Sequence, residues 1–255
     1  MSPASKPGDT RGQLYPPPPW SYIGARVLNV VCRAKAPQAV HGLIPAPLRA
    51  AREDGLFILW FLSVPSILEL GPHYRSTEGG ICIPARTADG AAAGSTFATM
   101  VVDNDVALIG GREIWGYPKQ MGTVGFDTCH DPRTVDVSIH HPLYRDGRGD
   151  LIVSATALLD GTGDAVLAIL PTLEPRLLKR TIPGPFHAGV ESEAILQVTT
   201  HSQVVHERCT GAAAVTFGPG MAWISDPGPI EVLGAVFSRC DFILPYAQPI
   251  QSTRS

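Results

Sequence analysis

No apolar run in the sequence approaches the length of a membrane-spanning helix, which is about 20 residues. The first 13 residues also lack the apolar core of a secretory signal. It also has no excess of basic residues: the formal net charge is -3, and no basic cluster stands out. There is therefore no electrostatic reason to expect a nucleic acid or an anionic membrane as a partner. We predict a cytoplasmic protein with neither kind of partner.

Cysteine spacing excludes two further classes of protein. The five cysteines are scattered, odd in number and never spaced as Cys-x-x-Cys: they are Cys32, Cys82, Cys129, Cys209 and Cys240. This arrangement indicates a reducing compartment, and it argues against a disulfide framework or a zinc knuckle.

Several common catalytic motifs are also missing. The sequence contains no Gly-x-Ser-x-Gly elbow, phosphate loop or dinucleotide fingerprint. Eight histidines are present, but neither His140-His141 nor the pair His201 and His206 has the spacing of a known metal site. We therefore expect no metal site.

What the sequence does contain is a large apolar fraction interrupted by many turn residues. Hydrophobic residues make up 44% of the 255 positions, enough for a full core, and the 26 glycines and 24 prolines favour short strands over long helices. We predict a disordered leader over residues 1–13 and one domain over residues 14–255. The fold class is α+β, mainly β, and the number of strands suggests a barrel or closed sheet with a few helices.

Apolar runs bounded by turn residues set the expected elements. We expect helices at 37–42 and 104–110, the second capped by Asp103, and a loop at 67–80. The run Leu56–Val64 reads as a strand covered on both sides, with a core helix as the alternative, and 164–180 is ambiguous. The other expected strands are 26–34, 81–85, 96–102, 122–129, 134–141, 151–159, 195–206 and 212–217.

The most informative stretch is the turn around Lys119. Pro118 fixes its own φ and pushes Tyr117 toward an extended conformation, so the lysine has little freedom at its root. Packing against Trp115, Tyr117 and Met121 would remove water from the ammonium group and lower its pKa. A useful nucleophile needs a pKa of about 7 to 8 instead of about 10.4, a difference of roughly 4 kcal/mol.

A neutral lysine amine can attack a carbonyl carbon to form a carbinolamine and then an iminium. That intermediate supports decarboxylation of a 3-oxo acid, aldol or retro-aldol cleavage, and dehydration. The alternative is a surface lysine after a proline turn, which the dipeptide Pro118-Lys119 alone would favour, because lysine is seldom buried.

A family resemblance favours the nucleophile. The chain resembles the acetoacetate decarboxylase family around its Schiff-base lysine in Asp103-Asn104, Ala107, Gly111-Arg112-Glu113 and Tyr117-Pro118-Lys119. Weaker similarities follow in order along the chain, at residues 18–20, 29–31, 77–80, 83–84, 210–211, 229–232 and 241–242. The resemblance implies a cone-like closed β-barrel with Lys119 inside, a covalent iminium and no cofactor.

The resemblance also suggests the other site residues. Glu78 stands where the family has a pocket carboxylate that could shuttle protons, although a solvated loop acid is the alternative. Tyr117 matches a tyrosine that lines the pocket, and Tyr246 is a weaker candidate of the same kind. Trp115 would border the substrate, and Arg112 would either contact the substrate or fix the turn.

Three departures from the family pattern bear on the chemistry. Gln120 replaces a second lysine, and could instead orient a hydroxyl or a water. The family's carboxylate-binding arginine aligns with Ala25, and the adjacent Arg26 would point to the opposite strand face unless a bulge intervenes. The run Leu56–Leu62 carries no acid where the decarboxylase has a pocket glutamate.

These departures leave an apolar cavity and argue against decarboxylation of acetoacetate itself. They are similar to those in the family's divergent branch, whose members perform aldol condensation and dehydration of 2-oxo acids, some in secondary metabolism. Our leading hypothesis is a Schiff-base lyase of that kind, which acts through Lys119 on a small or medium carbonyl or oxo-acid substrate and which we expect to be a homo-oligomer. The alternatives are a true 3-oxo-acid decarboxylase that uses Arg26, and a non-covalent cyclase or binder of a hydrophobic metabolite.

Overall fold

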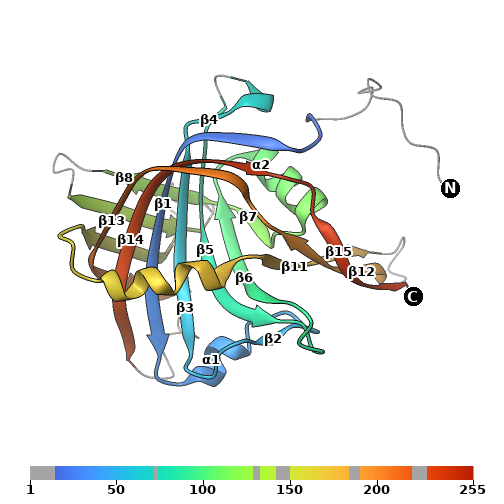
Figure 1. The fold of residues 1–255 in the computed structure, drawn as a ribbon, viewed down its shortest axis with the longest axis horizontal. Coiled ribbons are helices and arrows are strands. Elements are labelled where there is room, and N and C mark those ends of the chain that lie inside the picture. Colours follow the sequence, from blue (N-terminus) through green and yellow to red (C-terminus); the bar gives the residue numbers. More distant parts are fainter. Residues whose placement is uncertain are drawn as a thin grey trace.

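A computed structural model describes residues 15–71, 74–128, 133–141, 150–183, 190–219 and 229–254. The predicted leader, residues 1–13, lies outside this described part of the chain. Long strands dominate the fold and a few short helices flank them, so the mainly-β fold class is confirmed (Figure 1). None of the helices in the described ranges is long and apolar enough to cross a membrane.

The strands form one large sheet. They are β1 (Trp20–Ala34), β2 (Arg49–Ala50), β3 (Leu56–Val64), β4 (Ser66–Ile67), β5 (Ser76–Arg86), β6 (Ala93–Val102), β7 (Lys119–Met121), β8 (Thr123–Asp127), β9 (Thr134–His140), β10 (Leu151–Leu158), β11 (Arg176–Pro183), β12 (Val190–Val198), β13 (His201–Phe217), β14 (Ile230–Leu244) and β15 (Gln248–Arg254). The helices are α1 (Pro37–His41), α2 (Asp105–Gly110), the π-helical turn η2 (Gly111–Trp115), and the 3₁₀ segments η1 (Leu68–Leu70), η3 (Asp164–Ala168) and η4 (Leu170–Leu173).

The order of strands follows a single path, β15-β12-β11-β6-β5-β3-β1-β14-β13-β10-β9-β8. Its two ends, β15 and β8, are not paired with each other among the described residues, so the predicted closed barrel is not confirmed. Two pairings are parallel, and both involve β6: β7 pairs with it through Met100 and Lys119, and β11 through Ser95 and Arg176. The segment η3–η4 crosses the sheet and contacts β14, β13, β6 and β5 (yellow in Figure 1).

Strand β3 shows why the sheet has apolar side chains on both faces. Phe57, Leu59 and Phe61 belong to one core cluster, and Ile58 and Leu62 belong to a second cluster on the other face. The strand therefore alternates between two buried environments, as a continuous apolar run requires. Its bounds are the predicted ones, and the alternative of a core helix is wrong.

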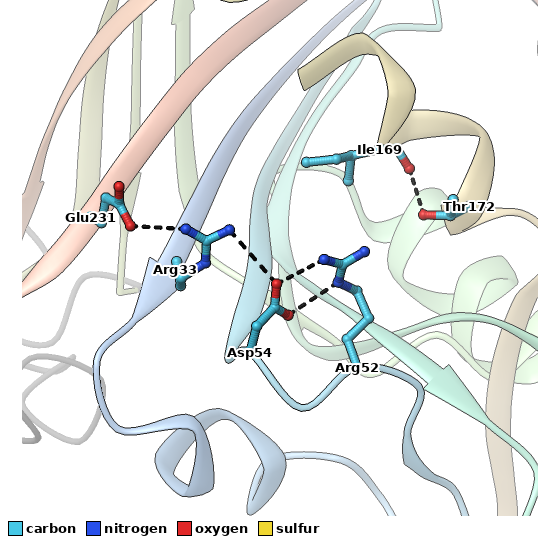
Figure 2. A network of polar contacts seen from close by, with 6 residues as sticks. All are labelled: Arg33, Arg52, Asp54, Ile169, Thr172 and Glu231. Carbon is cyan, nitrogen blue, oxygen red and sulfur yellow. Dashed lines mark hydrogen bonds and ion pairs between the residues drawn. The ribbon is translucent and has the colours of Figure 1, made fainter. Parts of the chain in front are cut away.

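An ionic network holds one end of the sheet together. The Arg33 guanidinium in β1 donates to Glu231 of β14 at 3.0 Å and lies 3.7 Å from Asp54, which also accepts from Arg52 at 2.7 Å. Figure 2 shows Arg33 between the two carboxylates. These side chains are partly exposed, so we expect each pair to contribute at most about 1 kcal/mol.

Two predicted elements need correction, and one ambiguous stretch can now be assigned. The expected loop at 67–80 is wrong because β5 begins at Ser76, where its backbone pairs with Val64 of β3. The expected strand 195–206 is two strands that break after Val198: β12 pairs with β11 and β15, while β13 pairs with β14 and β10. Residues 164–180, which were ambiguous, contain η3, η4 and the start of β11.

The predicted helix cap is also wrong by one residue. Asn104, and not Asp103, caps α2, since its side-chain oxygen accepts a hydrogen bond from the Ala107 amide at 3.1 Å. The Asp103 carboxylate instead accepts from the Thr77 backbone amide at 2.7 Å. Asp103 therefore links the end of β6 to β5 at Thr77, the residue before Glu78.

Candidate active site

A cavity of about 350 Å³ lies between the sheet and the η3–η4 segment. Its wall is mostly apolar, with Leu167, Leu170 and Leu173 contributed by η3 and η4. Five aromatic side chains complete that wall: Tyr22, Trp60, Phe97, Tyr117 and Phe242. Figure 2 shows part of this segment, where the Thr172 hydroxyl donates to the Ile169 carbonyl at 2.6 Å. The cavity can therefore enclose a small or medium organic molecule in largely dry surroundings.

Two ionisable side chains meet in this wall. The Lys119 ammonium nitrogen lies 2.7 Å from Oε2 of Glu78, and the two side chains are only 6% and 5% exposed. Glu78 comes from β5, where it pairs with Val102 of β6, and Lys119 comes from β7, where it pairs with Met100 of the same strand. The amine and the acid thus face each other across β6, inside the cavity.

The turn before β7 fixes the lysine backbone. Gly116 adopts φ 77°, a left-handed conformation that favours glycine, and it ends the π-helical turn η2. The Arg112 guanidinium donates to the Lys119 carbonyl at 2.9 Å. A methyl group added at Gly111 would lie 2.6 Å from Cδ of Lys119. The turn therefore leaves space for the lysine side chain and restrains its root.

Tyr117 places its aromatic ring near the amine. Its ring centroid lies 5.6 Å from Nζ of Lys119, and its ring packs edge-on against Phe97 with centroids 5.7 Å apart. Burial is the main reason that the pKa of Tyr117 is raised, and the same holds for the pKa of Tyr22 in the cavity wall. Both phenols therefore stay protonated near neutral pH and can donate hydrogen bonds.

Two of the proposed site residues lie close to Lys119 in the sequence but are not in the cavity wall. Gln120 is exposed, because side chains of a strand alternate and its neighbour Lys119 points inward. It therefore lies outside this cavity wall, and its contact with substrate stays a prediction. Arg112 is also exposed, and its hydrogen bond to the Lys119 carbonyl supports the alternative that it fixes the turn.

Trp115 and Tyr246 also lie elsewhere. Trp115 is buried in the core, where its indole nitrogen donates to the Pro245 carbonyl at 2.6 Å and its ring packs edge-on against Trp20. Tyr246 is 55% exposed and follows the end of β14. Neither side chain belongs to the wall of this cavity, and their contacts with substrate stay predictions.

The Arg26 side chain lies on the face of β1 that points away from the cavity, whereas the decarboxylase alternative needs it on the cavity face. Strand β1 does contain an irregularity between Tyr22 and Ala25, but Val27 and Asn29 line the cavity, and Arg26 is not in its wall. The Arg26 guanidinium instead donates to the hydroxyls of Ser63 and Thr128, at 2.9 and 3.2 Å. Arg26 therefore cannot hold a substrate carboxylate in this cavity.

The sequence did not point to Glu174 and Arg176, two charged residues that do line the cavity. Glu174 follows η4 and Arg176 begins β11, in the stretch whose structure was ambiguous. Burial raises the pKa of Glu174 from its ordinary value of 4.5, and the positive charge of Arg176 acts against that rise. A charge on each side of Pro175, between apolar residues, was the only sequence signal available.

The described residues include no group of three or more histidine, cysteine, aspartate or glutamate side chains that could hold a metal ion. What the cavity offers is an amine paired with an acid, neutral phenols and an apolar wall. Such a set of groups can form and break a covalent bond to a carbonyl compound.

This fold and this buried lysine define a class of protein. The family model for acetoacetate decarboxylase (ADC) matches residues 2–253, so the chain belongs to the acetoacetate decarboxylase family. Enzymes of this family act on small carbonyl compounds through a covalent lysine Schiff base and use no metal or external cofactor. The chain is accordingly a lysine-dependent enzyme of this lyase-like type.

Particular relatives cover most of the chain. Acetoacetate decarboxylase 3 of Mesorhizobium japonicum is 24% identical over 90% of this chain and 84% of its own length. The acetoacetate decarboxylase of Chromobacterium violaceum is 29% identical over 90% of this chain and 87% of its own length.

Solved structures share the fold. Acetoacetate decarboxylase from Legionella pneumophila superposes with a TM-score of 0.77 at 20% identity, covering 97% of this chain and 93% of its own. The enduracididine biosynthesis enzyme MppR in complex with pyruvate superposes with a TM-score of 0.72 at 17% identity, covering 94% and 93%. At these identities the likeness concerns the fold alone.

Proposed function

We propose that the chain is a Schiff-base lyase in which Lys119 attacks the carbonyl carbon of a small or medium carbonyl or oxo-acid substrate. The observation that carries the proposal is the contact of 2.7 Å between the Lys119 amine and the Glu78 carboxylate, both buried in one cavity. An amine in this position meets a carbonyl compound with little competition from water.

Glu78 has the position of a proton shuttle. In the resting site it pairs with the lysine, and it accepts a proton from Nζ as the carbonyl compound enters. The free amine adds to the carbonyl carbon, one proton moves from Nζ to the oxygen to give the neutral carbinolamine, and a second proton on that hydroxyl lets it leave as water. Glu78 returns its proton in that step, so the iminium forms next to an ionised carboxylate that stabilises its positive charge.

The iminium makes the next step possible. It withdraws electrons from the neighbouring carbon, so a proton can leave from that carbon or a carbon-carbon bond to it can break. The Tyr117 hydroxyl, which stays protonated, can donate to a substrate oxygen. Aldol or retro-aldol chemistry and loss of water all follow from this arrangement.

We favour aldol or dehydration chemistry over decarboxylation of acetoacetate. Gln120 replaces the second lysine, and Arg26 lies outside the cavity, so both polar groups that the decarboxylase pattern would supply are missing from the wall. MppR, which shares this fold, was solved with pyruvate and with the condensation product of pyruvate and imidazole 4-carboxaldehyde, and our proposal carries that kind of chemistry and a role in secondary metabolism over to this chain.

The second candidate is decarboxylation of a 3-oxo acid. What favours it is the name of the curated relatives, acetoacetate decarboxylases that align over most of their length. Release of carbon dioxide from 3-oxo acids at a rate that depends on Lys119 would support this candidate. We expect Arg26→Ala to leave such release unchanged, because Arg26 is not in the cavity wall.

Borohydride reduction in the presence of carbonyl compounds tests the Schiff base. We expect pyruvate, acetoacetate or a longer 2-oxo or 3-oxo compound to add a covalent mass to Lys119, and Lys119→Ala to abolish it. Glu78→Gln should slow adduct formation about 10²- to 10⁴-fold, the usual contribution of a proton-transferring group. If none of these compounds leaves an adduct, and Lys119→Ala keeps full turnover, a non-covalent cyclase or binding protein is the better interpretation.

A further inference from the structure

The cavity has a second polar end, at Arg176. This residue begins β11, and its backbone pairs with Ser95 of β6. Its side chain is only 12% exposed. Nη1 donates to the Ser95 hydroxyl at 2.6 Å and to Sγ of Cys82 at 2.8 Å, and the guanidinium carbon lies 5.3 Å from the centroid of the Phe97 ring. The guanidinium is therefore fixed in the wall before any substrate arrives.

Part of this guanidinium is available to a ligand. Nε lies 3.4 Å from Oε1 of Glu174, which makes a loose ion pair. Within the described part of the chain, Nη2 of Arg176 has no hydrogen-bond partner. Nη2 is also not fully buried, since it is absent from the set of fully buried polar atoms without a partner. Because Arg176 lines the cavity, this nitrogen is open to a group that enters it.

The charges around the cavity favour an anion. Its wall contains two carboxylates, Glu78 and Glu174, and three cations, which are Lys119, Arg176 and, on the exposed side of the wall, Arg208. With every group ionised, the wall carries one excess positive charge. A substrate with a single carboxylate would neutralise that charge, and a guanidinium binds a carboxylate well because two N–H groups can donate to two oxygens.

The two charged ends are separated along the cavity. Strands β7 and β11 pair with the same edge of β6, at Met100 and Ser95, five positions apart. At about 3.3 Å per residue these backbone positions are roughly 16 Å apart. The rings of Tyr117 and Phe97 lie between them, since Lys119 is next to the first ring and Arg176 is next to the second.

We infer that Arg176 is a specificity-determining residue, which binds a substrate carboxylate at the end of the cavity remote from Lys119. The preferred substrates are then oxo acids whose carboxylate is several carbons away from the carbonyl group that reacts with the amine. This inference rests on the proposed function, because it takes the carbonyl group to be held at Lys119. It assigns to Arg176 the part that sequence comparison would give to Arg26.

Adduct formation with a matched set of compounds tests the inference. Borohydride trapping at Lys119 is measured against the concentration of 5-oxohexanoate, its methyl ester and acetoacetate. A hydrogen-bonded pair of a guanidinium and a carboxylate should strengthen binding about 10- to 100-fold. We therefore expect the concentration of 5-oxohexanoate that gives half-maximal adduct formation to be lower than that of its methyl ester by this factor. It should also half-saturate at a lower concentration than acetoacetate.

Arg176→Gln keeps a hydrogen-bonding side chain but removes the charge. We expect it to raise the half-saturating concentration of 5-oxohexanoate about 10- to 100-fold and to leave that of the ester unchanged. Arg26→Gln removes an equal charge from a position outside the cavity, and serves as the matched control without effect on either compound.

The outcomes separate the two proposals. If Lys119 is trapped by the ester and by the acid equally well in the unaltered protein, the inference about Arg176 is wrong and the Schiff base stands. An equal loss for acid and ester in Arg176→Gln would show that the guanidinium only supports the fold. Should that variant fail to fold, the acid-to-ester ratio of the unaltered protein decides. No adduct with any compound would instead overturn the proposed function.

Discussion

At the scale of single residues, the lysine and its acid have to be considered as a pair. A buried ion pair adds little net stability, but removal of one partner leaves an uncompensated charge and commonly costs about 3 to 5 kcal/mol. Lys119→Ala therefore removes the nucleophile and also strands the Glu78 carboxylate in an apolar wall. Loss of activity in such a variant is informative only if the protein is shown to remain folded.

The raised pKa of Glu174 predicts how stability depends on pH. Burial raises its pKa above 4.5, so the folded chain holds this proton at pH values where the unfolded chain has released it. Stability contributed by the protonated group is present below about pH 4.5 and is lost as pH rises through the folded pKa. We expect the free energy of unfolding of the native chain, minus that of Glu174→Gln, to decrease as pH rises from below 4.5. Denaturant titrations of both proteins over that range measure this difference.

A difference that stays constant or increases with pH would contradict the raised pKa. Glutamine is a suitable replacement because it retains the size of the side chain and removes the titration.

Cavity residues could be predicted from the sequence where they belong to a recognisable local motif. They could not be predicted where the pairing of strands far apart in the sequence brings them to the cavity. Lys119 and Tyr117 could be identified because the motif around Pro118 resembles that of the family's Schiff-base lysine, whereas the dipeptide Pro118-Lys119 alone would have favoured a surface lysine. Gln120 lies outside the cavity wall because one position along a strand reverses the direction of a side chain. Arg176 could not be found, since only the pairing of β11 with the edge of β6 brings it to the cavity.

At the scale of elements, the π-helical turn η2 is what leaves space for the amine. Gly111 has φ -59°, which alanine also adopts, so the absence of a side chain there reflects the approach of Lys119 and not backbone strain. A Cβ at this position would lie 2.6 to 3.0 Å from Cδ, Cε and Nζ of the lysine.

Gly111→Ala should therefore displace the Lys119 side chain from Glu78. We expect the rate of adduct formation at Lys119 to fall about 100-fold, the effect of a misplacement near 1 Å. Gly110→Ala is the matched control, because its Cβ would meet the Trp20 ring at 2.7 Å. That variant should lose stability but not the position of the amine. Full activity in folded Gly111→Ala would show that the lysine does not need this space.

Elements were predicted best where one strong pattern decides them. The apolar run of β3 gave exact bounds, because a strand buried on both faces needs no alternation. Strand β5 was expected to be shorter than it is, since Thr77-Glu78-Gly79-Gly80 has the composition of a loop and becomes a strand only through its ladders with β3 and β6. The break between β12 and β13 was missed because no glycine or proline marks it.

At the scale of the whole molecule, two tryptophans join distant parts of the chain around the lysine turn. Trp20, at the start of β1, packs edge-on against Trp115 with ring centroids 4.9 Å apart, and both side chains are only 1% exposed. The indole of Trp115 donates to the carbonyl of Pro245, after β14. The turn is therefore held by both ends of the domain.

Trp115→Phe tests this structural role. It removes the hydrogen bond to the Pro245 carbonyl and should cost about 1 to 3 kcal/mol, which lowers the melting temperature by several degrees. Because Trp115 is not in the cavity wall, we expect the half-saturating concentration of a trapped ketone to remain the same. A raised concentration with an unchanged melting temperature would instead indicate that Trp115 contacts the substrate.

Because the acid and the amine lie on strands at opposite edges of β6, catalytic activity depends on the register of both strands against β6. Glu78 is opposite Val102 on one edge of this strand, and Lys119 is opposite Met100 on the other. A slip of one residue on either edge would turn one of the two side chains to the wrong face while nearly all hydrogen bonds of the sheet could re-form. A misaligned preparation would keep a normal far-ultraviolet spectrum and lose its turnover, so specific activity is the more sensitive assay of correct folding for this enzyme.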